Sequence, residues 1–134
     1  MQNYSAQELY NILIDTDECV FIEAKCEDDT SASLMESVCS FSNEPGLGGG
    51  YILLGVGEDK NSNENRFPLE GVNDCDKKQL DISTQCASMF NISVRPKIEV
   101  EKVNGIKVLK IFVPELPSQQ KPLYLAVSVN SVAF

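Results

Sequence analysis

The 134-residue sequence contains no histidine. This absence excludes imidazole general bases, Ser-His and Cys-His nucleophile pairs, and the commonest zinc ligand. The sequence also lacks the run of ~18 apolar residues that a membrane-spanning helix needs, and it has no export signal at its N-terminus. We therefore expect a cytoplasmic protein that does not enter a membrane.

Cysteine pairs with a recognisable spacing are also missing. The sequence has five cysteines, and no two of them form a Cys-x-x-Cys motif. An odd number of cysteines without an export signal is typical of reduced thiols in the cytosol. The sequence therefore predicts five free thiols, at Cys19, Cys26, Cys39, Cys75 and Cys86.

Positive charge is scarce. Eleven lysines and arginines stand against 20 acidic residues, which gives a net charge of −9. A field of this sign repels phosphate backbones at long range. It argues against a general nucleic-acid binder, and it favours, as one alternative, a non-catalytic protein-interaction or dimerisation module.

The remaining composition is that of a single globular domain. Hydrophobic residues make up 43% of the chain and charged residues 23%, and a chain of this length can bury a core without disulfides or metals. The sequence stops at Ala133-Phe134, directly after an apolar run. We expect one domain over residues 1–134, cut from a longer protein.

Apolar periodicity and turn residues predict the order of the elements. Ser5 and Glu8 have the spacing of a helix capping box, and Asp74 can cap a later helix. Helices are expected at residues 5–15, 32–42 and 74–90, and strands at 19–25, 51–56, 97–103, 106–113 and 123–129. This order predicts an α+β fold, in which about three helices pack on a mixed β-sheet.

The dipeptide Asn104-Gly105 predicts a two-residue hairpin turn, because a type I′ turn needs a positive φ at both positions. Basic residues gather around it, so the hairpin could be an arm that contacts nucleic acid. Glu99 and Glu101 lie in the same strand, and cross-strand ion pairing is the equally weighted alternative. The basic residues are Arg95, Lys97, Lys102, Lys107 and Lys110.

Four glycines, at positions 46, 48, 49 and 50, precede the strand at 51–56. They match neither the phosphate loop of nucleoside triphosphatases nor the dinucleotide-binding pattern, in which the glycines precede a helix. A tight turn from helix to strand is the favoured interpretation, and an anion-binding nest is the alternative.

Four motifs follow one another along the sequence. They are Glu18-x-x-x-x-Glu23-x-Lys25, Val38-Cys39-Ser40-Phe41-Ser42-Asn43, the glycine-rich strand Gly49-Gly50-Tyr51-Ile52-Leu53-Leu54-Gly55-Val56, and the closing set of Pro96, Asn104-Gly105, Val113-Pro114 and Lys121-Pro122. In this order they resemble the Schlafen AlbA-like family, whose acidic opening strand is similar to the first motif. Microbial members are usually described as DNA-binding or transcriptional-regulator domains, and they often lie at the N-terminus of longer chains. Animal relatives include nucleases that cut tRNA and rRNA.

The resemblance also implies a carboxylate site. It maps Glu18 and Glu23 onto the family's acidic residues, with Asp59, or Glu58 beside it, as the third. Such oxygen ligands suit Mg²⁺ or Mn²⁺, which could activate water at a phosphate, and Lys25 could contact that phosphate. Surface acids in water, or a pair between Glu23 and Lys25 on one strand face, are the alternatives.

These observations together predict a nucleic-acid-binding domain, most specifically the DNA-binding domain of a transcriptional regulator. A metal-dependent endoribonuclease that uses Glu18, Glu23 and Asp59 is the first alternative. An interaction module that pairs with a second copy of the chain is the other.

Overall fold

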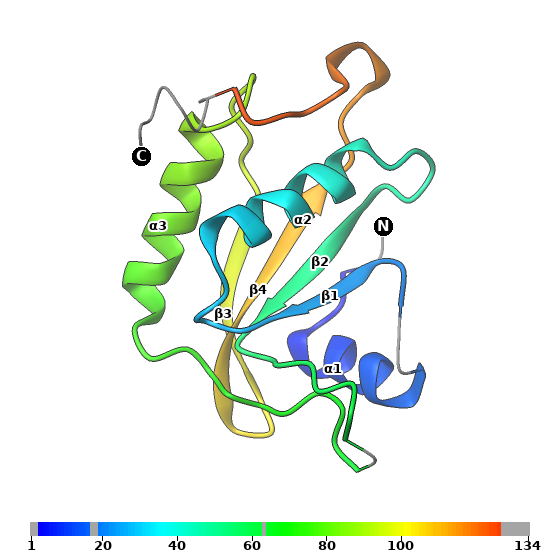
Figure 1. Ribbon diagram of the computed structural model, residues 1–134, viewed down its shortest axis with the longest axis vertical. Coiled ribbons are helices and arrows are strands. Elements are labelled where there is room, and N and C mark those ends of the chain that lie inside the picture. Colours follow the sequence, from blue (N-terminus) through cyan, green and yellow to red (C-terminus); the bar gives the residue numbers. More distant parts are fainter. Residues whose placement is uncertain (1–2, 17–18, 63, 127–134) are drawn as a thin grey trace.

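The computed structural model describes residues 3–16, 19–62 and 64–126 (Figure 1). Three α-helices pack on a four-stranded mixed sheet, which confirms the predicted α+β fold. No helix in the described ranges is long and apolar enough to cross a membrane. The elements are α1 (Ala6–Thr16), β1 (Ile22–Lys25), α2 (Ser31–Asn43), β2 (Gly49–Leu54), α3 (Cys75–Ser88), β3 (Lys97–Val103), β4 (Ile106–Pro114) and the short 3₁₀-helix η1 (Ser118–Gln120).

The sheet has the strand order β1-β2-β4-β3. β1 runs parallel to β2, and the other neighbours are antiparallel. All six residues of β2 are buried, as the sequence predicted for a strand covered on both faces. The last predicted strand is not formed in its described part, where Leu125 makes only an isolated bridge with Phe90.

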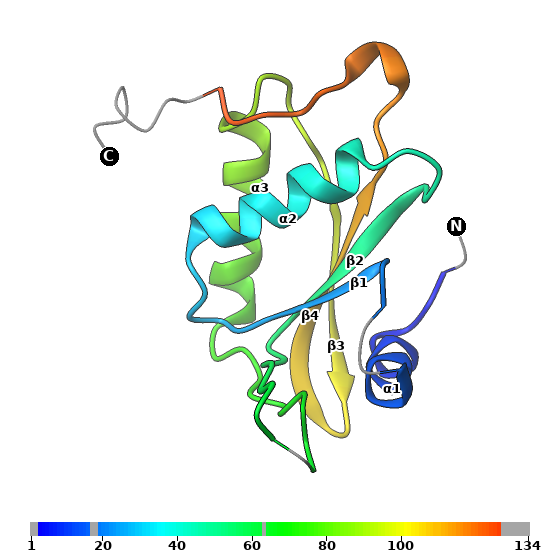
Figure 2. The same ribbon diagram turned by 45° about the vertical axis from the view of Figure 1, so that its right-hand side comes forward.

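Helices cover both faces of the sheet (Figure 2), with α1 on one side and α2 and α3 on the other. Alternate residues of β2 therefore enter different cores. Ile52 packs with the residues of α2 and α3, whereas Leu53 packs with those of α1. Burying such a side chain contributes roughly 1.5–3 kcal/mol, so the two cores hold the helices firmly on the sheet.

Local signals fix the ends of the elements. The Ser5 hydroxyl accepts from the Glu8 N–H at 3.1 Å, and the Glu8 carboxylate accepts from the Ser5 N–H at 2.8 Å, which confirms the capping box. Asp74 caps α3 by accepting from the Lys77 N–H at 3.1 Å. Asn104 and Gly105 have φ values of 50° and 83°, so the predicted hairpin turn is present between β3 and β4.

The glycine-rich segment turns the chain from α2 into β2. Gly48 and Gly49 have φ values of 77° and 116°, a backbone conformation that residues with a side chain rarely adopt. The N–H of Gly48 donates to a carboxylate oxygen of Glu115 at 2.9 Å, and Lys121 pairs with the same carboxylate. The turn therefore forms as expected, and it binds an acidic side chain of its own chain.

Candidate nucleic-acid interface

The β3–β4 hairpin separates its charges onto two faces. Residues two apart along a strand share a face, and Val103 packs in the α1-side core whereas Ile98 packs against the other core. Glu99 and Glu101 therefore face α1, and Lys102 faces the side of α2 and α3. The two acidic residues of β3 thus lie on the opposite face from Lys102 and do not dilute its charge.

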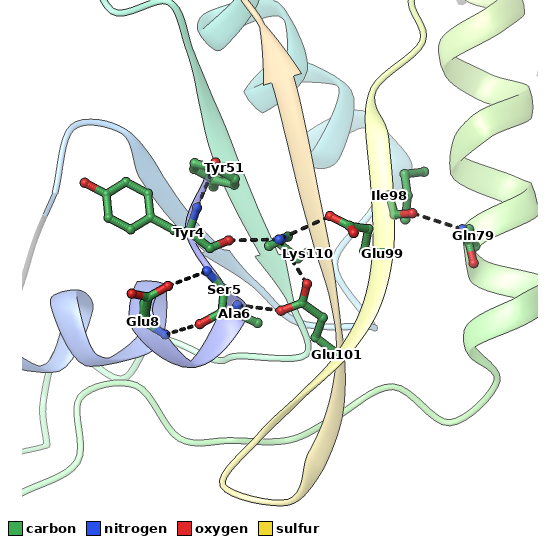
Figure 3. Close-up of polar contacts among 10 residues, drawn as sticks. All are labelled: Tyr4, Ser5, Ala6, Glu8, Tyr51, Gln79, Ile98, Glu99, Glu101 and Lys110. Carbon is green, nitrogen blue, oxygen red and sulfur yellow. Dashed lines mark hydrogen bonds and ion pairs between the residues drawn. The ribbon is translucent and has the colours of Figure 1, made fainter. Parts of the chain in front are cut away.

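Lys110 pairs with the carboxylates of both Glu99 and Glu101. It lies opposite Glu99 in the register of the hairpin. The Lys110 Nζ atom is 3.1 Å from Glu99 and 2.9 Å from Glu101, and it donates to the Tyr4 carbonyl at 2.8 Å (Figure 3). The Lys110 side chain is only 4% exposed. The prediction that Lys110 lies on an exposed basic arm is therefore wrong, because α1 and the segment before it cover this part of the sheet.

The protonation states of this cluster favour the ion pairs. Burial opposes the charge of Lys110, but hydrogen bonds with Glu101 and Glu99 outweigh it, so the pKa of Lys110 is raised. Burial likewise opposes the charge of Glu101. Hydrogen bonds from the Ala6 N–H and from Lys110 outweigh that effect, so the pKa of Glu101 lies below its ordinary value of 4.5.

A pH dependence of stability follows from Glu101. Because its folded pKa is lowered, its stabilising contribution is complete above the unfolded pKa and is lost as the pH falls through the folded one. We expect the free energy of unfolding to decrease as the pH drops below about 4.5, and less steeply in Glu101→Gln. Urea denaturation at a series of pH values measures both slopes. Glu36→Gln, at an exposed site on α2, is the matched control, and an equally reduced slope in that variant would contradict the assignment.

The other basic residues of the hairpin region are available to a ligand. Lys102 and Lys107 are exposed and lie directly opposite each other across β3 and β4. Like charges in this position destabilise a sheet, so the pair does not contribute to folding stability. Arg95 and Lys97 are exposed at the start of β3. Within the part of the chain that the structure describes, no carboxylate lies within 4 Å of these four cations.

The predicted carboxylate site remains a prediction. Glu18 lies outside the described residues, and the described ranges contain no group of three His, Cys, Asp or Glu side chains that could hold a metal. Glu23 accepts from the Ser37 hydroxyl at 3.0 Å, and Asp59 accepts from the Asn61 N–H at 3.1 Å within its own loop. Glu58 is 3.5 Å from Arg66.

Lys25 lies on the same strand face as Glu23, as the alternation of β1 requires. Its Nζ atom donates to the Ser33 hydroxyl of α2 at 2.6 Å. Ser33 and Ser37 are one helical turn apart, so α2 presents one hydroxyl to each of the two charged strand residues. This polar seam fixes α2 over β1, the edge strand of the sheet on the side away from the hairpin.

Comparison with known proteins gives the family. The model of the family described as Schlafen, AlbA_2 matches residues 18–132. The chain belongs to this family. The resemblance of the sequence motifs to this family is therefore confirmed, and the match extends over most of the fold described above. No curated protein matches the sequence.

The solved structures that are similar to this Schlafen AlbA_2 domain include the following two. One is the N-terminal domain of a Nitrosomonas europaea protein named for its relation to the ATP-dependent DNA helicase RecG. It is 42% identical, has a TM-score of 0.83, and the match covers 92% of this chain and 82% of that one. The other is the DIP2311 protein of Corynebacterium diphtheriae. With 19% identity, a TM-score of 0.51, and coverage of 78% of this chain and 19% of that one, it shows a similar fold alone.

Proposed function

We propose that this chain is a nucleic-acid-binding domain, and specifically the DNA-binding domain of a transcriptional regulator, which contacts phosphates through the β3–β4 hairpin. The family and the RecG-related neighbour support a role connected with nucleic acid. The observation that carries the proposal is the division of charge on the hairpin. Lys110 pairs with both acids on one face, and the other face presents Lys102 and Lys107 together.

The net charge of −9 is compatible with this use. At physiological ionic strength the Debye length is about 8 Å, so acids farther away than this are largely screened from a phosphate at the hairpin. The charges close to the hairpin therefore determine whether a phosphate is attracted there. The overall negative field slows the approach of the nucleic acid. The dependence of affinity on salt comes from the phosphates that the lysines neutralise.

Charge reversal on the hairpin tests the proposal. We expect Lys102→Glu combined with Lys107→Glu to weaken binding about tenfold or more, similarly for different nucleotide sequences, because phosphate contacts carry no sequence information. In a plot of the logarithm of affinity against the logarithm of salt concentration, the slope should become less steep by about 0.7–0.9 for each phosphate that is no longer neutralised. Fluorescence anisotropy with labelled oligonucleotides over a salt series measures both quantities.

The matched control is Lys60→Glu combined with Lys77→Glu, which changes the net charge equally at exposed sites outside the hairpin. We expect this control to retain most of the affinity. Equal losses in the two variants would show that only net charge matters, and the hairpin would no longer be the interface. Wild-type protein that binds no oligonucleotide at low salt would instead support the interaction module without nucleic acid.

A further inference from the structure

A cleft of about 230 Å³ lies between α3 and the segment that leads into β3. Figure 2 shows the helix standing beside this segment. One wall comes from α3 and the other from the chain just before Lys97, so the cleft opens beside the basic residues at the start of the hairpin. Its lining residues are Ser83, Ala87, Val94, Arg95 and Pro96.

Hydrogen bonds hold the cleft open from both ends. At one end the N–H of Val94 donates to the carbonyl of Cys86 at 2.9 Å. At the other end the Gln79 Nε2 atom donates to the carbonyl of Ile98 at 3.2 Å (Figure 3). The two walls are therefore fixed relative to each other before any ligand arrives, and a preformed site costs little ordering free energy on binding.

The chemistry of the lining suits one flat heterocycle. Ala87 and Pro96 offer apolar surface to a ring, whereas Val94 is only 5% exposed, and the Ser83 hydroxyl can donate to or accept from the polar edge of the ring. The Arg95 guanidinium can stack on a ring or pair with a phosphate. The volume is below the ~300–1,000 Å³ of clefts that enclose drug-sized ligands, so it fits a single ring system better than a whole nucleotide.

We propose that this cleft takes one unpaired nucleobase of a single strand whose phosphates lie along Arg95 and the hairpin lysines Lys102 and Lys107. The inference rests on the proposed nucleic-acid binding and adds the class of ligand. Paired bases inside a duplex cannot reach a pocket on a protein surface, whereas the bases of a single strand can splay out and be stacked. The domain therefore prefers single-stranded nucleic acid to a duplex.

The surface between the cleft and the turn of the hairpin continues the same pattern. β3 carries the chain from Lys97 to Lys102 over roughly 17 Å at about 3.3 Å per residue. Val100 lies between these lysines on the same strand face as Lys102, and it is 41% exposed. Lys97 points to the opposite face of β3, because it is five residues from Lys102. On the face toward α2 and α3, the exposed Val100 beside Lys102 offers an apolar surface next to a cation, as a strand whose phosphates and bases alternate along its length requires.

Filling the cleft tests the inference. Ala87→Leu places a larger side chain on an exposed helix position that lines the cleft, and Ser83→Leu closes it from a second position if the first variant folds poorly. We expect single-strand affinity to fall about tenfold, because stacking of one base is worth a factor of this order. Duplex affinity should change less than about twofold. Thr84→Leu, exposed on the same helix outside the cleft, is the matched control.

Anisotropy titrations with one labelled oligonucleotide, alone and annealed to its complement, give these values. Wild-type protein that binds the duplex as tightly as the single strand would overturn the inference while leaving the proposed function intact. The inference would also be overturned, and the proposed function left intact, if Ala87→Leu and Ser83→Leu both bind the single strand with the same affinity as Thr84→Leu. Failure to bind either form would instead remove the proposed function itself.

Discussion

Replacing Lys110 with methionine is expected to lower the free energy of unfolding by about 3 kcal/mol. The methionine side chain nearly fills the same space but carries no charge. Glu99 and Glu101, which are 40% and 26% exposed, would then face each other without a cation, and the Tyr4 carbonyl would lose its donor. Their partial exposure sets the expected loss at the lower end of the range for broken buried pairs.

Urea denaturation at neutral pH measures this loss. Lys107→Met, on the same strand but exposed, is the matched control and should change stability by less than about 0.5 kcal/mol. Adding Glu101→Gln to Lys110→Met should restore part of the stability, since it removes one of the two repelling charges. A Lys110→Met variant as stable as Lys107→Met would show that the buried ion pairs do not stabilise the hairpin.

Gly49→Ala is the second change with a large expected effect, a loss of about 3 kcal/mol or more. A Cβ atom at this position would overlap the carbonyl oxygen of Val113 and come within 2.8 Å of the Pro114 Cα atom. These are backbone atoms of the neighbouring strand and cannot turn aside. Steric overlap and a φ of +116° each contribute on the order of 1–3 kcal/mol.

Gly48→Ala separates the two contributions. Its φ of +77° is also in the left-handed region, but a Cβ atom there would meet nothing within 4 Å. We expect a loss of about 1 kcal/mol from backbone conformation alone. Thermal or urea unfolding of both variants measures the difference, and equal losses would contradict the role assigned to the close approach of β2 and β4.

Much of the fold could be predicted because its signals are local. The capping box of α1, the cap of α3 and the Asn104-Gly105 turn each depend on residues a few positions apart, and all three are present. The apolar run of β2 identified a central strand for the same reason. The last predicted strand failed in its described part because β propensity does not determine which partner a segment finds.

The candidate site was predictable only in part. A two-residue turn at Asn104-Gly105 sets the register of the hairpin, so the pairing of Lys102 with Lys107 and of Glu99 with Lys110 follows from sequence. What does not follow is which face α1 covers. The contact of Lys110 with Tyr4 joins positions 106 residues apart, and only the packing of the whole chain shows that this lysine is buried while its neighbours are exposed.

The hydrogen bond from Gln79 to Ile98 also affects how molecules meet in concentrated solution. β3 is at the edge of the sheet, and exposed edges can recruit strands from other chains and begin aggregation. Gln79 occupies one carbonyl of this edge, and Lys97 and Lys102 place charge beside the remaining groups. An incoming strand would have to displace the glutamine and bury two ammonium groups, so the domain exposes a long β-strand while giving fibrillar growth a poor template.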